Sequence, residues 1–200
     1  ANDIAYHSDK ISRNYNYLIN VLGADHTGYI KRITAATKAL SENKTVLICK
    51  VCQLVKLFKN GQPYKMSKRA GDFISVRELL DEVSKDSIRF MMLNRSNDVE
   101  LDFDFQKVLE KTRENPIFYV QYCYARISSL FRTLKINAND SFEIDEKNFT
   151  LNEPELNLLR KIIDWPKVIE TAANKFEPHR IPFYLYELAT LFHSYWSKGN

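Results

Sequence analysis

The stretch VLICKVCQLVKLFKNGQPYKMSKRAGDF, residues 46–73, decides how the surrounding chain is expected to fold. It begins with a run rich in Val, Ile, Leu and Phe, which favours strand structure. Asn60-Gly61 then gives a strong signal for a tight turn. The basic segment Lys65 to Gly71 follows. The pattern therefore predicts a loop with several cations, placed directly after a hairpin-like segment.

The residues before this stretch indicate an α/β arrangement. Residues 7–17 are polar and compatible with a helix, residues 18–22 read as a short strand, and residues 23–26 read as a loop. Apolar side chains between Tyr29 and Leu40 recur at intervals of three and four residues, which predicts a helix. Strand, loop, helix and strand in this order are typical of the end of an α/β nucleotide-binding domain.

The chain after the basic loop reads as helical. Ser75 and Glu78 form the pattern of a capping box, and Asp86 is expected to cap a further short helix. The motif LDFDF, residues 101–105, marks a junction. We therefore expect an α/β part over residues 1–100, followed by an all-α helical bundle over residues 101–200.

A long helix is expected to begin at Asn115-Pro116, because proline is favoured at the first helical position. The helix is expected to bury an apolar stripe made of Ile117, Val120, Tyr124, Ile127, Phe131 and Leu134. Residues 137–152 read as a loop. Further helical stretches are expected around residues 156–163, with a break near Pro166, and from Pro178 onward.

Tyr119, Tyr122 and Arg126 are expected on the opposite, exposed face of the long helix. Two aromatic rings and a guanidinium at spacings of three and four residues suit stacking on unpaired bases. The alternative is that they are ordinary surface residues, because the protein contains eleven tyrosines. The pattern by itself leaves both interpretations open.

Composition and charge restrict the possible classes of protein. The 200 residues are 44% hydrophobic, which is enough for one sizeable core or two smaller ones. A net charge of +4 permits a nucleic-acid partner without requiring one. Cys49, Cys52 and Cys123 are too few for a disulfide framework and suit a reducing cytoplasm. A zinc site is not expected, because the Cys49–Cys52 pair lacks further clustered ligands. No transmembrane segment is expected either.

The loop Lys65-Met66-Ser67-Lys68-Arg69 has the chemistry of a polyphosphate site. Three cations within five residues can neutralise charge that develops on phosphates in a transition state. Ser67 can donate a hydrogen bond, and Met66 can anchor the loop in an apolar pocket. A solvated basic turn is the alternative, and it would be the better interpretation of an arbitrary K-x-S-K-R sequence.

The segment KMSKRAGD, residues 65–72, is similar to the Lys-Met-Ser-Lys-Ser signature of class I aminoacyl-tRNA synthetases at four of five positions. It departs at Arg69, where the signature has serine. The wider sequence resembles the bacterial arginyl-tRNA synthetases over essentially its whole length. The resemblance is carried by GADHTGYIKR, KMSKRAGDFISVRELLDEV, DSIRFMMLNR, LDFDF and NPIFYVQYCYARISSLFR.

This resemblance implies a role for several residues. Lys68 would be the principal catalytic cation, and Lys65, Met66, Ser67 and Arg69 would complete the ATP loop. Asp25 and His26 would approach the ribose and base of ATP, and Asp3 would pair with the guanidinium of the substrate arginine. Tyr119, Tyr122 and Arg126 would contact the anticodon loop, and Arg132 would contact a phosphate. Capping or terminal roles remain the alternatives for Asp3 and Asp25.

The resemblance also implies a class I Rossmann-type nucleotide-binding domain and an anticodon-binding helical bundle, each present in part. The expected activity is the ligation of L-arginine to tRNA(Arg), with ATP and its Mg²⁺ as the second substrate. The parent protein is expected to be cytoplasmic and monomeric. The 200 residues contain no His-x-Gly-His, the second class I signature. We therefore expect this chain to be part of a longer protein and inactive alone. The alternatives are a stand-alone RNA-binding module and another class I synthetase, such as the cysteinyl type.

Overall fold

The computed structural model describes residues 2–64, 74–137, 139–141 and 149–198. The chain forms two compact units, each made of two stretches of sequence. Unit 1 contains Ala1–Lys56 and Asn97–Asp102, and unit 2 contains Leu57–Ser96 and Phe103–Asn200. The expected domain boundary at residue 100 stays a prediction about the parent protein.

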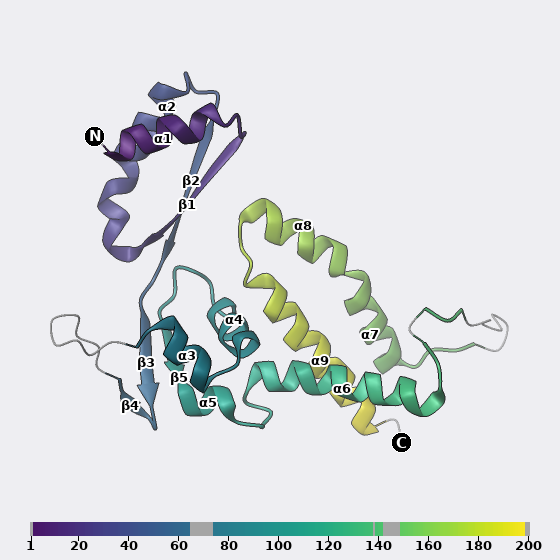
Figure 1. Ribbon diagram of the computed structural model, residues 1–200. Coiled ribbons are helices and arrows are strands. Elements are labelled where there is room, and N and C mark those ends of the chain that lie inside the picture. The colour runs from purple at the N-terminus through teal and green to yellow at the C-terminus, as the bar shows by residue number, and fades with distance from the viewer. Residues whose placement is uncertain (1, 65–73, 138, 142–148, 199–200) are drawn as a thin grey trace. The chain divides into compact units, whose positions relative to one another are not determined.

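Unit 1 is built on a parallel pair of strands, β1 (Tyr17–Gly23) and β2 (Val46–Cys52), seen side by side in Figure 1. Their register runs from Tyr17↔Val46 to Gly23↔Cys52. Between them lie a 3-10 helix, η1 (Ala24–Tyr29), and the helix α2 (Ile30–Leu40). The strand expected at residues 18–22 and the helix expected between Tyr29 and Leu40 are confirmed, whereas the helical segment expected over residues 7–17 ends at Ser12. The expected loop at residues 23–26 is wrong, because β1 extends through Gly23 and η1 begins at the next residue.

The helix α1 (Asn2–Ser12) is joined to β1 by a buried polar network. The Asn20 amide donates to Nε2 of His7 at 2.9 Å, and Lys10 donates to the Asn20 oxygen, also at 2.9 Å. His7 and Asn20 are buried. Because buried polar groups are costly when unpaired, this network fixes α1 against one face of β1.

The hairpin predicted at Asn60-Gly61 is present. The backbone φ angles of Asn60 and Gly61 are 54° and 72°, the left-handed values that a two-residue hairpin turn needs. The turn joins β3 (Val55–Lys59) to the short antiparallel strand β4 (Gln62–Pro63). These strands and β5 (Leu101–Asp104) form a sheet in the order β4-β3-β5. The apolar run that begins at Val46 thus divides between β2 and β3. The expectation that residues 101–200 are all-α is wrong at β5, because this segment adds to the sheet beside β3.

Short helices follow in unit 2. The capping box at α3 (Val76–Glu82) is confirmed, because Ser75 accepts from the Glu78 N–H and the Glu78 carboxylate accepts from the Ser75 N–H. Asp86 does not cap α4 (Lys85–Leu93). Ser84 does so instead, by accepting from the Ser87 N–H at 3.1 Å. Asp86 lies inside the first turn, where a carboxylate still suits the helix dipole.

The helix α6 (Pro116–Leu134) begins where the sequence predicts, with Asn115 at the N-cap and Pro116 at the first helical position. The Asn115 side chain nevertheless does not cap α6. It donates to the carbonyl oxygens of Val108 and Glu110, and so ties α6 to the end of α5 (Phe105–Leu109). The helix ends at Lys135, which adopts a left-handed conformation with φ 56°.

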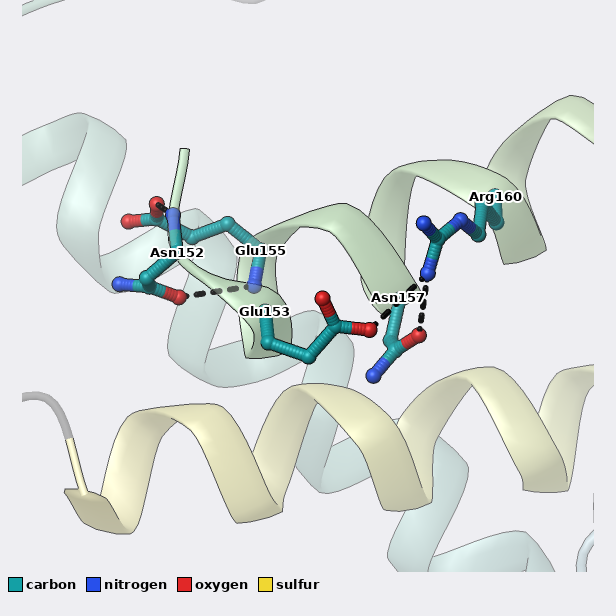
Figure 2. Close-up of polar contacts among 5 residues, drawn as sticks. All are labelled: Asn152, Glu153, Glu155, Asn157 and Arg160. Atoms are coloured by element: carbon teal, nitrogen blue, oxygen red, sulfur yellow. Dashed lines mark hydrogen bonds and ion pairs between the residues drawn. The ribbon is translucent and has the colours of Figure 1, made fainter. Parts of the chain in front are cut away.

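Three helices complete unit 2: α7 (Glu153–Ile163), α8 (Trp165–Lys175) and α9 (Arg180–Lys198). Figure 2 shows a capping box between Asn152 and Glu155 at the start of α7, and Arg160 bonded to Glu153 and Asn157. The break expected near Pro166 is confirmed, since Asp164 alone separates α7 from α8. Proline cannot supply the N–H that a continuous helix requires at that point.

The core of unit 2 is apolar and aromatic. Phe103 and Phe105 are fully buried and pack edge to face, with ring centroids 5.6 Å apart. The helices α7 and α9 are linked by Tyr195, whose hydroxyl donates to the Glu155 carboxylate at 3.0 Å. Across the described part of the chain, no helix is both long enough and apolar enough to cross a membrane.

Candidate nucleic-acid interface

Side chains from α6 and α9 form a cluster of rings around one guanidinium, which we call the α6–α9 cluster. It contains Tyr119, Tyr122 and Arg126 from α6, and His193 and Trp196 from α9. The α6 members share one helix face because they are three and four residues apart. The two helices are seen crossing in Figure 1.

The Arg126 guanidinium is held by both hydrogen bonds and ring faces. One terminal nitrogen donates to the Tyr122 hydroxyl at 2.8 Å, and the other lies 3.2 Å from Nδ1 of His193. The guanidinium carbon lies 4.3 Å from the centre of the Tyr122 ring and 5.7 Å from the centre of the Trp196 ring. These distances are in the range of cation–π contacts.

The rings of the cluster pack against one another, stacked in one pair and tilted in the other. His193 lies 4.3 Å from Tyr119 and 5.4 Å from Tyr122, measured between ring centroids. Tyr122 also stacks on Phe118 at 5.8 Å with an interplanar angle of 9°. Tyr122 remains 41% exposed and Trp196 38% exposed, so solvent-facing aromatic surface persists beside the fixed cation.

The expected apolar stripe of α6 is partly wrong. Tyr124 is 74% exposed and Leu134 is 56% exposed, although both were expected to be buried. The expected exposed face of α6 is confirmed for Tyr122. It is wrong for Tyr119 and Arg126, which are half-buried because this face packs on α9. The sequence pattern of α6 cannot reveal which face meets a helix that begins far along the chain. The expected RNA contacts stay predictions.

His193 and Trp196 were not identified from the sequence. The signal that could have found them is their spacing of three residues on α9, in a segment rich in aromatic side chains. Arg132 lies in the last turn of α6 and is exposed. Its side chain makes no hydrogen bond or ion pair within the described residues, which leaves the guanidinium available for the expected phosphate contact.

The residues expected to bind arginine and ATP in unit 1 lie in two places. Asp3 is exposed in the first turn of α1, and Asp25 and His26 are exposed in η1. The His26 Nε2 lies 3.6 Å from an Asp25 carboxylate oxygen, which is a weak contact at such exposure. Their expected roles stay predictions.

Tyr29 connects η1 to the surroundings of Asp3. Burial, and then the nearby Asp3 carboxylate, raise the pKa of Tyr29. The Tyr29 hydroxyl is buried and makes no hydrogen bond to the described residues. Asp3 and Tyr29 therefore belong to one neighbourhood of unit 1.

The basic loop lies outside the described residues. This applies to Lys65, Met66, Ser67, Lys68 and Arg69, so the expected ATP contacts and the catalytic role of Lys68 stay predictions. Cys49 lies in β2 as expected, but it is half-buried, and burial raises the pKa of its thiol. Within the residues that the structure describes, no three His, Cys, Asp or Glu side chains are grouped to hold a metal ion.

Comparison with known proteins gives consistent matches. Residues 120–200 match the family model described as "DALR anticodon binding domain". The arginine–tRNA ligase of Pelagibacter ubique is 60% identical over 200 residues, and that of Roseobacter denitrificans is 52% identical over 204 residues. Both matches cover 100% of this chain and 35% of the relative. The chain thus spans about a third of the length of these relatives.

Two solved structures of arginyl-tRNA synthetases are also similar to this chain. A Campylobacter jejuni crystal structure named as an arginyl-tRNA synthetase is similar with a TM-score of 0.85 and 36% identity, over 98% of this chain and 42% of that one. The arginyl-tRNA synthetase of Thermus thermophilus has a TM-score of 0.63 at 23% identity, over 88% of this chain and 32% of that one. The second likeness shows the fold alone.

Proposed function

We propose, from the premise that this chain corresponds to the C-terminal region of the bacterial arginyl-tRNA synthetases, that it reads the anticodon of tRNA(Arg) for an arginine–tRNA ligase. The observation that carries the proposal is the α6–α9 cluster, which lies almost wholly within the residues that match the anticodon-binding family. Aromatic faces beside a fixed guanidinium suit unpaired bases of an anticodon loop.

The α/β part is proposed to complete the activity of the parent protein. The parallel pair β1–β2 and its connecting helix are consistent with the end of a Rossmann-type nucleotide-binding domain. There Asp3 would bind the guanidinium of arginine, as a carboxylate matches a planar fork of donors. Asp25, His26 and the loop with Lys65, Met66, Ser67, Lys68 and Arg69 would bind ATP, which carries Mg²⁺ as part of the substrate.

Chemistry at this site would rest on positioning and electrostatics. Lys68, aided by Lys65 and Arg69, would neutralise charge on the pyrophosphate that leaves as arginyl-adenylate forms. The whole protein is proposed to act in the cytoplasm as a monomer. The 200 residues by themselves contain no His-x-Gly-His, and we expect no charging of tRNA by this chain in an assay with ATP and radiolabelled arginine. Detectable charging would contradict that expectation.

The anticodon assignment is tested by binding. The chain is titrated against labelled tRNA(Arg) transcript, and against a transcript with a changed anticodon, at one stated salt concentration. We expect tighter binding of the native transcript. Tyr122→Ala and Arg126→Ala should remove most of this preference, about tenfold, because stacking on one base contributes about 1–3 kcal/mol. Tyr124→Ala is the matched control, an exposed α6 tyrosine outside the cluster.

Arg132→Ala separates phosphate contact from base reading. A phosphate contact carries no sequence information, so this variant should weaken both transcripts alike and reduce the salt dependence of binding. Equal binding of both transcripts by the unmodified chain would overturn the anticodon assignment.

A further inference from the structure

His193 bonds to two α6 members of the α6–α9 cluster, one through each nitrogen of its ring. It is 5% exposed. Its Nε2 lies 3.1 Å from the backbone carbonyl oxygen of Tyr119, and its Nδ1 lies 3.2 Å from a terminal nitrogen of Arg126.

The two partners decide where the imidazole proton lies. A carbonyl oxygen can only accept a hydrogen bond, so Nε2 carries the proton and donates it to Tyr119. A guanidinium can only donate, so Nδ1 must present its lone pair to Arg126. Both bonds are satisfied by one species, the neutral Nε2–H tautomer.

The bond from Arg126 to His193 restricts the guanidinium more than its ring contacts can. Cation–π attraction holds a cation over a ring but leaves it free to turn in the plane. The hydrogen bonds to His193 and Tyr122 fix both terminal nitrogens, so the plane of the fork is set. Arg126 keeps further N–H donors that neither bond uses, beside the partly exposed rings of Tyr122 and Trp196.

We propose that His193 is a positioning residue, whose Nδ1 lone pair orients Arg126 for reading an unpaired base. This inference rests on the proposed function and deepens it. His193 does not touch the RNA, because it is buried. Its effect is to order the Arg126 side chain before binding, which lowers the entropy cost of forming the complex.

A histidine that only fills the core would need its bond to Tyr119 and no more. Two conservative variants separate the roles. In His193→Asn, the amide oxygen takes the place of Nδ1 and can still accept from Arg126. In His193→Gln, the amide nitrogen takes the place of Nε2 and can still donate to the Tyr119 carbonyl. His193→Leu removes both bonds.

The test measures the preference of the full 200-residue chain for native over anticodon-changed transcript, at fixed salt. We expect His193→Leu and His193→Gln to lower the preference about tenfold, as for Arg126→Ala, and His193→Asn to stay within about twofold of the unmodified chain. Thermal unfolding of each variant shows whether a loss follows from instability. A preference that is retained by the Gln variant and lost by the Asn variant would overturn the proposal, as would equal behaviour of all three.

A second readout does not use RNA. In ¹⁵N NMR spectra, His193 should show a protonated Nε2 and an unprotonated Nδ1, and the Arg126 terminal nitrogens should show slowed rotation that is lost in His193→Leu. A protonated Nδ1, or Arg126 signals unchanged by the Leu variant, would overturn the positioning role. If the unmodified chain binds both transcripts equally, the proposed function fails, and these signals still decide whether His193 orients Arg126.

Discussion

The strands β1 and β2 differ from the helices α6 and α9 in which of their faces are buried. The β1 strand buries Leu18 and Asn20 on one face, but Tyr17 is 60% exposed and Val21 is 69% exposed on the other. Parallel strands are normally covered on both faces. A strand that alternates exposed and buried residues is therefore uncommon among them. A helix needs to cover only one of its faces, and α6 packs the face with Tyr119, Tyr122 and Arg126 against α9.

Among the described residues, unit 1 and unit 2 each contain one buried histidine, His7 and His193, and the two differ in tautomer. Nδ1 of His7 donates to the Asp3 carbonyl at 2.7 Å, while its Nε2 accepts from Asn20. His193 has the reverse arrangement, with Nε2 as the donor. The partners available in the fold therefore decide the proton position of an otherwise identical side chain. We also predict that the stability of the β1–β2 sheet depends on a buried polar network, whereas the stability of unit 2 depends on its buried apolar side chains.

The largest effect is expected from the apolar core of unit 2. Phe103→Ala removes a ring with no exposed surface and leaves a cavity beside Phe105. We expect the free energy of unfolding to fall by about 3–5 kcal/mol, measured by urea denaturation. Tyr124→Ala, which deletes a 74% exposed ring, should change it little. Similar losses in the two variants would contradict the prediction that buried apolar side chains stabilise unit 2.

A smaller effect is expected from the polar network of unit 1. Asn20→Ala leaves Nε2 of His7 without its donor and Lys10 without its acceptor, so we expect a loss of about 1–3 kcal/mol. Hydrogen exchange should locate the loss in β1 and β2. Asn16→Ala, at an exposed position just before β1, is the matched control. Faster exchange in α6 and α9 instead would contradict a local role for the network.

The smallest effect is expected at the start of α3. Hydrogen bonds from the Ser75 backbone N–H, and then its side chain, lower the pKa of Glu78 below its ordinary value of 4.5. A carboxyl whose pKa is lower when folded stabilises the protein above the unfolded pKa, and this contribution is lost as the pH falls through the folded one.

The unmodified chain should therefore lose slightly more stability below pH 4.5 than Glu78→Gln, in urea unfolding at a series of pH values. Since Glu78 is exposed, the difference should be far smaller than the effect of Phe103→Ala. Parallel pH profiles would show that the capping carboxylate contributes nothing. A large difference would show that this helix cap contributes as much to stability as the buried core.

The local features of this chain could be predicted because they depend on neighbouring residues. Asn60-Gly61 adopts the left-handed turn, Ser75 and Glu78 cap α3, and Pro166 breaks the helix, each for a reason contained within a few positions. The errors also have local causes. Ser84 takes the N-cap of α4 in place of Asp86, and the Asn115 side chain donates to two carbonyl oxygens outside its own helix.

The sequence by itself determined the order β1, α2 and β2, the start of α6 and the choice of Tyr119, Tyr122 and Arg126 as candidates. The tertiary structure alone decided that α9 packs on these side chains, because periodicity states which residues share a face but not what the face meets. His193 is 67 residues from Arg126 along the chain, and its role arises only when folding brings the two together.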